Sequence, residues 1–123
     1  METPYPVPTA AQYVEGLKAV SISAAQRKML MFHYLAHNRT VTYTELADAA
    51  EYDSYGAANL HYGKLGAALG EQLKMPFVPL SADSDTPFFS SAIGTSKKYE
   101  GTEYMLIMHH ELAKAIQALG WSN

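Results

Sequence analysis

Apolar residues recur at helical spacing in several stretches of this chain. Each stretch follows a residue that favours a helix start, such as Thr9, Ser23 or Ser54, and each ends near a residue that favours a stop, such as Asn38, Pro76 or Gly120. The pattern therefore predicts helices over residues 9–20, 23–37, 44–50, 55–74 and 109–119.

Between the fourth and fifth predicted helices the pattern changes to short apolar runs. Residues 77–80 are typical of the beginning of a strand, and residues 88–93 and 103–108 of two strands joined by a loop over 94–101. Val41, between two threonines, favours a short extended piece. Helices followed by a β-hairpin and a C-terminal helix predict an α+β, winged helix-turn-helix-like fold. We expect one domain over residues 9–123, preceded by a proline-containing extended arm over residues 1–8.

The fourth predicted helix has two faces of different character. Its core side holds alanine, leucine and one tyrosine: Ala58, Tyr62, Leu65, Leu69 and Leu73. A second stripe is rich in glycine: Gly56, Asn59, Gly63, Gly66 and Gly70. Each interior glycine costs a helix roughly 0.5–1 kcal/mol relative to alanine, so a close neighbour is expected there. That neighbour is either another part of this chain or a separate molecule, and the stripe alone does not decide between them.

A short helix, a polar turn and a longer helix over residues 40–73 predict a helix-turn-helix, a unit often used to place one helix in a DNA groove. The N-terminal half of the second helix would read the bases, with asparagine suited to adenine and lysine to guanine or phosphate. Two lysines in the following hairpin would reach the DNA backbone. The candidate nucleic-acid-binding residues are Ser54, Tyr55, Asn59, His61, Lys64, Lys97 and Lys98.

Charge favours a different partner. The formal net charge is −3, and the nine basic residues are scattered rather than gathered in one stripe. Phosphates would be repelled by the four acids on the third predicted helix and the turn after it. An alternative is a protein partner bound through the acidic turn or the glycine stripe, with the candidate residues Glu45, Asp48, Glu51, Asp53, Gly63 and Gly66.

Catalytic and metal-binding patterns are missing from the sequence. There is no cysteine, no phosphate-binding loop and no Gly-x-Ser-x-Gly motif. His33 and His37 are four residues apart, but no third ligand is evident, and two exposed histidines near a helix end are the commoner arrangement. We therefore predict no enzyme activity, no metal site and no cofactor. No signal peptide and no apolar run near 18 residues are visible, so we expect a cytoplasmic chain without a membrane partner.

Two motifs resemble a known family. Thr42-x-x-x-Leu46-Ala47 is followed by Tyr52-x-Ser54-Tyr55-Gly56-Ala57-Ala58-Asn59-Leu60-x-Tyr62-Gly63-x-Leu65-Gly66. This run resembles a helix-turn-helix module found beside HNH nucleases in bacterial restriction-type proteins, and residues 108–121 resemble the end of that module. The resemblance implies a role in DNA recognition. No HNH-type set of histidine and asparagine follows, so we expect the recognition module alone.

A fainter resemblance links Val41-x-Tyr43-x-x-Leu46-Ala47 to the DNA-binding domain of O6-alkylguanine alkyltransferases. Their reactive Pro-Cys-His-Arg is absent, so only the fold could transfer. Our first hypothesis is a small non-enzymatic protein that binds double-stranded DNA. The alternative is an adaptor or inhibitor that binds another protein, for example one of a defence or restriction system. Homodimer formation is left open.

Overall fold

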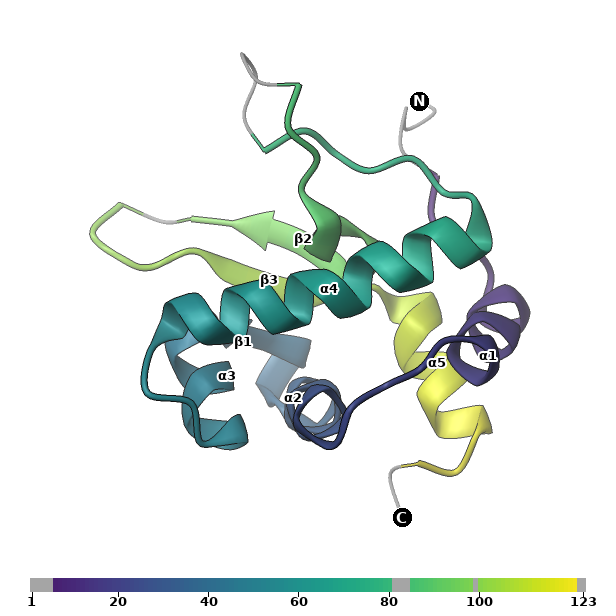
Figure 1. Ribbon diagram of the computed structural model, residues 1–123, viewed down its shortest axis with the longest axis horizontal. Coiled ribbons are helices and arrows are strands. Elements are labelled where there is room, and N and C mark those ends of the chain that lie inside the picture. The colour runs from purple at the N-terminus through teal and green to yellow at the C-terminus, as the bar shows by residue number, and fades with distance from the viewer. Residues whose placement is uncertain (1–5, 81–84, 99, 122–123) are drawn as a thin grey trace.

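The computed structural model describes residues 6–80, 85–98 and 100–121 (Figure 1). Five α-helices and three short strands make an α+β fold, which is consistent with the predicted winged-helix-like layout. The helices are α1 Ala10–Ala19, α2 Ala24–Leu35, α3 Tyr43–Ala50, α4 Tyr55–Leu73 and α5 His110–Ala118. Two 3-10 turns, η1 His37–Arg39 and η2 Phe89–Ala92, precede the strands β1 Thr40–Thr42 and β2 Gly94–Lys97 respectively, and β3 is Met105–Met108.

Reciprocal side-chain caps explain where three of the helices begin. Thr9, Ser23 and Thr42 each accept a hydrogen bond from the backbone three residues on, and the Gln or Glu at that position bonds back to the cap. This arrangement satisfies two backbone donors that a helix start would leave unpaired. Left-handed residues then end α3 and α4, at Glu51 with φ 62° and Lys74 with φ 55°.

The sheet is antiparallel, with the strand order β1-β3-β2. Val41 lies opposite Leu106, and Ser96 lies opposite the same residue from the other side. Because side chains alternate along a strand, Val41, Leu106 and Met108 all face the core and are buried. The threonines of β1 lie on the outer face, only partly covered.

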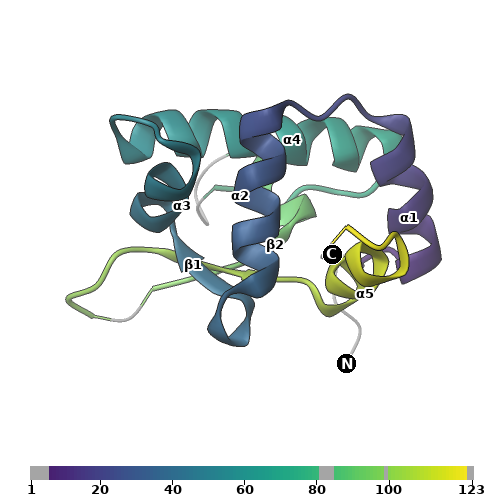
Figure 2. The ribbon, with the colours of Figure 1, turned by 90° about the horizontal axis from the view of Figure 1, so that it is seen from below.

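The core lies between α4 and the sheet, with α2 and α3 closing its lower side (Figures 1 and 2). Ala58, Tyr62, Leu65 and Leu69 of α4 are almost fully buried, so the predicted core side of this helix is confirmed. Burial of such side chains is the main force that holds the layers together. A second packed seam joins the first and last helices, α1 and α5.

In that seam α1 and α5 lie side by side (Figure 2). The Tyr13 hydroxyl of α1 donates to the carbonyl of Ala92 at 2.7 Å. Glu111 of α5 accepts a hydrogen bond from the backbone N–H of Ala10 at 3.1 Å. Trp121 packs on the core, with the Arg27 guanidinium 3.8 Å from its ring centre. The first and last helices, which are distant in sequence, are therefore joined to each other and to the rest of the fold.

Two strand predictions are wrong. Residues 88–93 contain the turn η2 rather than a strand, and residues 77–80 hold only the isolated bridge between Pro79 and Pro87. The stretch before β2 crosses α4 closely, and it turns there with Ser91 N–H bonded to Phe88 at 3.0 Å and Ile93 N–H bonded to Ser90 at 2.9 Å. Close crossing favours such a turn because a buried backbone must satisfy its own polar groups. The first strand of the hairpin is instead β2, within the predicted loop 94–101.

Of the proline-containing arm, residues 1–5 lie outside the described residues, and residues 6–9 form neither helix nor strand. Among the described residues, every helix is too short or too polar to span a bilayer.

Candidate nucleic-acid interface and adjoining cleft

The N-terminal half of α4 presents four of the predicted nucleic-acid-binding side chains to solvent. Ser54, Tyr55, Asn59 and Lys64 are all exposed, and Tyr55 keeps 66% of its surface accessible. Ser54 also has a structural role, because its Oγ accepts from the backbone N–H of Ala57 at 3.3 Å and so caps the helix. The structure therefore brings these four residues onto one end of one helix.

His61 differs from its neighbours. It is half-buried, and its ring stacks on Tyr52 of the preceding turn, with 5.2 Å between ring centroids and 19° between planes. Its carbonyl accepts a hydrogen bond from the Gln26 side chain of α2 at 3.0 Å. His61 thus links α4 to α2 and to the turn, which makes it less available to a ligand than Lys64.

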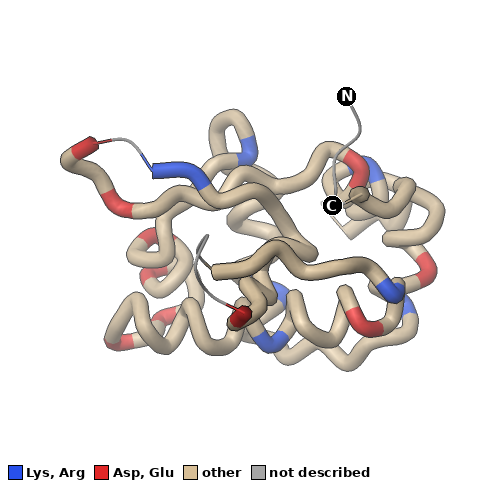
Figure 3. The backbone as a smooth tube through the Cα atoms, turned by 90° about the horizontal axis from the view of Figure 1, so that it is seen from above, with Lys and Arg blue, Asp and Glu red and all other residues tan. Residues whose placement is uncertain are grey.

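The two hairpin lysines do not share a surface with each other. Lys97 lines a shallow depression on the outer face of the sheet, together with Glu45 and Glu103. Lys98 lies with its ammonium 5.1 Å from the ring centre of Tyr104. Two acids, Glu100 and Glu103, follow the two lysines in the same hairpin (Figure 3). The hairpin is therefore balanced in charge rather than basic.

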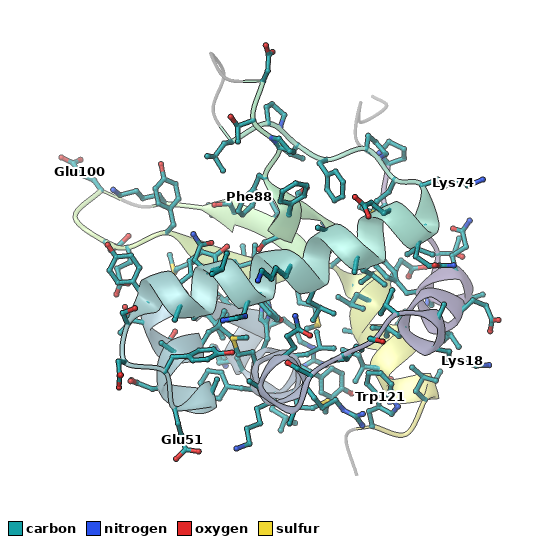
Figure 4. The ribbon with its side chains drawn as sticks, in the orientation of Figure 1. Lys18, Glu51, Lys74, Phe88, Glu100 and Trp121 are labelled. Carbon is teal, nitrogen blue, oxygen red and sulfur yellow. The ribbon has the colours of Figure 1, made fainter. Side chains whose placement is uncertain are left out.

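A cleft of about 650 Å³ opens between α4, the segment after it and β2, and it was not predicted from the sequence. Tyr55 and Asn59 line it from α4, while Ser96 and Tyr104 line it from the hairpin. Figure 4 shows Phe88 between α4 and the segment that rises above it, and Phe88 forms part of the apolar wall. The cleft has no charged side chain among its described lining residues. The sequence signal that marks it is the apolar stretch 75–80, of which residues 77–80 are predicted above as the beginning of a strand.

Few polar groups reach the cleft, and two of them are distinctive. The Tyr43 hydroxyl is buried and makes no hydrogen bond of good geometry within the described chain. Burial raises its pKa, with a smaller opposing effect from Ser90. His109 donates from Nε2 to the Ser91 carbonyl at 2.8 Å, which leaves Nδ1 as an acceptor, and burial lowers its pKa. A concave apolar surface with a few such polar groups is typical of a ligand site.

The glycine stripe is split between two environments, which corrects the prediction that it meets another molecule. A Cβ at Gly66 would lie 2.2 Å from the carbonyl oxygen of Phe89, and one at Gly70 would lie 2.4 Å from the Phe77 ring. Both glycines are buried by this chain's own segment 77–92. Gly66 therefore is unsuited to binding a partner directly. A Cβ at Gly63 would meet nothing within 4 Å, so this glycine stays open.

The acidic candidates are exposed but not equally free. A Glu45 side-chain oxygen accepts from the backbone N–H of Thr42 at 2.8 Å, so this residue completes the cap of α3. Glu51 forms an exposed ion pair with Lys28 of α2 at 3.5 Å. Asp48 and Asp53 are exposed on α3 and the turn. Asp53 directly precedes the Ser54 cap of α4, where its charge lowers the attraction of this end for phosphate.

The predicted pair of exposed histidines is wrong. His33 is fully buried, and both of its ring nitrogens are engaged, with Tyr62 and with the Leu106 carbonyl, each at 2.9 Å. It cannot share a metal ion with the exposed His37 without losing these bonds. Among residues 6–80, 85–98 and 100–121, no group of three His, Asp or Glu side chains is placed to hold a metal ion.

Comparisons of this chain with protein-family models, with curated proteins and with solved structures find no match.

Proposed function

We propose that this chain is a small, non-enzymatic domain that binds double-stranded DNA through a winged helix-turn-helix-like arrangement. In this arrangement α3 and α4 form the helix-turn-helix, α4 enters the major groove and the β2–β3 hairpin lies on the DNA backbone. The order α2, β1, α3, α4 and hairpin, with strand order β1-β3-β2, supports this proposal. A cytoplasmic location is part of the same proposal.

The observation that carries the proposal is the outward position of the N-terminal half of α4. Tyr55 and Asn59 are exposed on the flank of α4 that lines the cleft, and Lys64 is exposed on a separate flank, while Ala58, Tyr62 and Leu65 face the core and are buried. Asn59 can make two hydrogen bonds to adenine, and Lys64 can reach guanine or a phosphate. A helix that exposes this set on its N-terminal half is suited to reading base edges.

The charge of the chain limits how such a domain would bind. The described lysines of α4 and of the hairpin are Lys64, Lys97 and Lys98, and acids lie near both elements. Each phosphate neutralised contributes about one unit to the slope of affinity against salt on logarithmic axes. We therefore expect a shallow slope, on the order of two to three units, and affinity that depends on base contacts.

The test is a titration of a fluorescent pool of random duplexes at low salt, followed by sequencing of the bound fraction. The proposal predicts binding that weakens as salt is added and enrichment of a short motif. An Asn59→Ala variant should lose the preference at one base position while keeping residual binding. At 20–50 mM salt, non-specific affinity for duplexes should be ~10-fold or more above that in physiological salt. If no duplex binds even under these conditions, the proposal is wrong.

A second candidate function is binding to a basic protein surface, as an adaptor or inhibitor of a defence or restriction system. The exposed acids Asp48 and Asp53 favour this function. Glu45 and Glu51 are less free, because Glu45 accepts a hydrogen bond in the cap of α3 and Glu51 pairs with Lys28. Partner capture from the source cytoplasm should fail with a double Asp48→Asn and Asp53→Asn variant. The Asn59→Ala variant should capture the same partner as the wild-type chain.

A further inference from the structure

We infer that the cleft between α4 and β2 is a binding site for an extended, uncharged peptide, which pairs with β2 as an added strand. This inference goes beyond DNA binding, although Tyr55 and Asn59 line the cleft and also belong to the proposed DNA surface. It depends on three features of the described chain: a free strand edge, the contact of that edge with the cleft and the neutral chemistry of the cleft walls.

The hydrogen-bond pattern of the hairpin identifies the groups on the free edge. The N–H of His109 donates to the carbonyl of Ile93 at 3.0 Å. In an antiparallel pair, hydrogen-bonded positions alternate along the strand, so Thr95 and Lys97 also bond toward β3. The N–H and C=O groups of Gly94 and Ser96 then point the other way. The sheet order places β2 at an edge, and no described strand pairs with that side.

The cleft meets this edge rather than one face of the strand. Gly94, Thr95 and Ser96 all line it, although successive side chains of a strand point to opposite faces. Only the strand's edge can present three consecutive residues to one cavity. Unpaired edges of this kind bind extended peptides, with main-chain hydrogen bonds giving affinity and side-chain pockets giving specificity.

The cleft walls define the chemistry of the peptide. Val78 and Leu80 on one side and Tyr55 and Tyr104 on the other are apolar or aromatic, and all four are well exposed. Since no described lining residue is charged, a phosphate or a charged side chain would lose its water without gaining a counter-ion. A peptide with uncharged residues, apolar at alternate positions, complements these walls.

The test uses a phage library of random seven-residue peptides, selected on the immobilised chain. Wild-type chain should enrich uncharged sequences with alternating apolar positions. Ser96→Pro removes the outward N–H without removing a bond to β3, and proline is tolerated on an edge strand. The Ser96→Pro variant should lower the affinity for the selected peptide at least about tenfold, which corresponds to the loss of one hydrogen bond. Ser96→Ala, which keeps the N–H, should bind the peptide much more tightly than Ser96→Pro.

Two further measurements keep the result independent of the folding of one variant. Leu80→Asp places a charge at a 60% exposed position of the wall and should also weaken the peptide. Methylating the peptide amides that face β2 should abolish binding, while methylating the alternate amides should not. Lys64→Ala should leave peptide binding unchanged, so loss of DNA binding and loss of peptide binding are separable.

The inference is overturned by any of three outcomes. The first is that no peptide is enriched, or that charged sequences are. The second is that Ser96→Pro, shown folded by its circular dichroism, binds the selected peptide as well as Ser96→Ala. The third is that the peptide-free chain dimerises through β2 in solution, because a second copy would then be the occupant of the edge.

Discussion

The hydroxyl of Tyr62 in α4 donates a hydrogen bond of 2.9 Å to Nδ1 of His33 in α2, inside the core. The direction of this bond follows from the other ring nitrogen. Nε2 of His33 lies 2.9 Å from the carbonyl of Leu106, and a carbonyl can only accept, so Nε2 carries the proton. One neutral imidazole thus joins α2, α4 and β3, the three layers of the fold.

This buried imidazole makes stability depend on pH. Burial, the largest effect, lowers the pKa of His33 from 6.5 to about 4. The unfolded chain therefore binds a proton as pH falls below 6.5, whereas the folded chain resists it until about pH 4. We expect the free energy of unfolding to fall by about 2 kcal/mol between pH 7 and pH 5. Urea unfolding at several pH values measures this loss.

The control for this prediction is His110→Gln, which changes an exposed histidine and should keep the full pH dependence. His33→Gln should flatten it. Some dependence should remain in His33→Gln, because burial also lowers the pKa of His109. A wild-type chain equally stable at pH 7 and pH 5 would contradict the neutral, buried state of His33.

Tyr62→Phe should destabilise the chain at pH 7. The ring of Tyr62 is fully buried and keeps its packing in this variant, but Nδ1 of His33 loses its donor. A buried acceptor without a partner costs about 1–3 kcal/mol. Thermal or urea unfolding measures the loss, and nitrogen chemical shifts of His33 report the change at Nδ1. No loss of stability would mean that water or another group replaces the tyrosine hydroxyl.

Two glycines of α4 should respond to alanine with opposite signs. Gly66→Ala places a methyl group against the backbone of Phe89, which cannot move aside as a side-chain tip could. We expect a loss of about 1–3 kcal/mol from this overpacking. Gly63→Ala meets nothing within 4 Å and should gain roughly 0.5–1 kcal/mol from the better helix propensity of alanine. Equal effects at both positions would contradict the close contact of Phe89 and Ser90 with Gly66.

Ser54 allows its two roles to be separated. Ser54→Ala removes the cap of α4 and should cost about 1 kcal/mol of stability. Ser54→Asp keeps a cap of similar strength but adds a negative charge at the proposed DNA surface. We therefore expect Ser54→Asp to fold like wild type and to bind duplexes more weakly. If Ser54→Asp binds duplexes unchanged, the start of α4 is not near the DNA backbone.

Lys64→Ala should lower the slope of duplex affinity against salt by about one unit, as expected for one lost phosphate contact. The matched control is Lys18→Ala, since Lys18 lies on α1 in an exposed ion pair with Glu15. This control removes the same charge on a helix that packs at the C-terminal end of α4, away from its proposed DNA-reading half. An equal effect of both variants would mean that binding responds to net charge alone rather than to a located surface.

The sequence by itself determined the helices and the inner side of α4. Thr9, Ser23 and Ser54 cap helices as predicted, because capping depends on residues only three positions apart. The burial of Tyr62 and Leu65 followed from helical periodicity for the same local reason. Tyr55, Asn59 and Lys64 are exposed at positions of the same helix outside that buried face.

Tertiary structure alone decided what covers the glycines and where the cleft lies. Gly66 and Gly63 are indistinguishable by residue type and by stripe, yet residues 77–92 cross one and not the other. Where they cross α4, residues predicted as a strand form η2 instead, and β2 has a free edge beside the cleft. Both results depend on close approach between segments far apart in the chain, and local periodicity carries no information about such contacts.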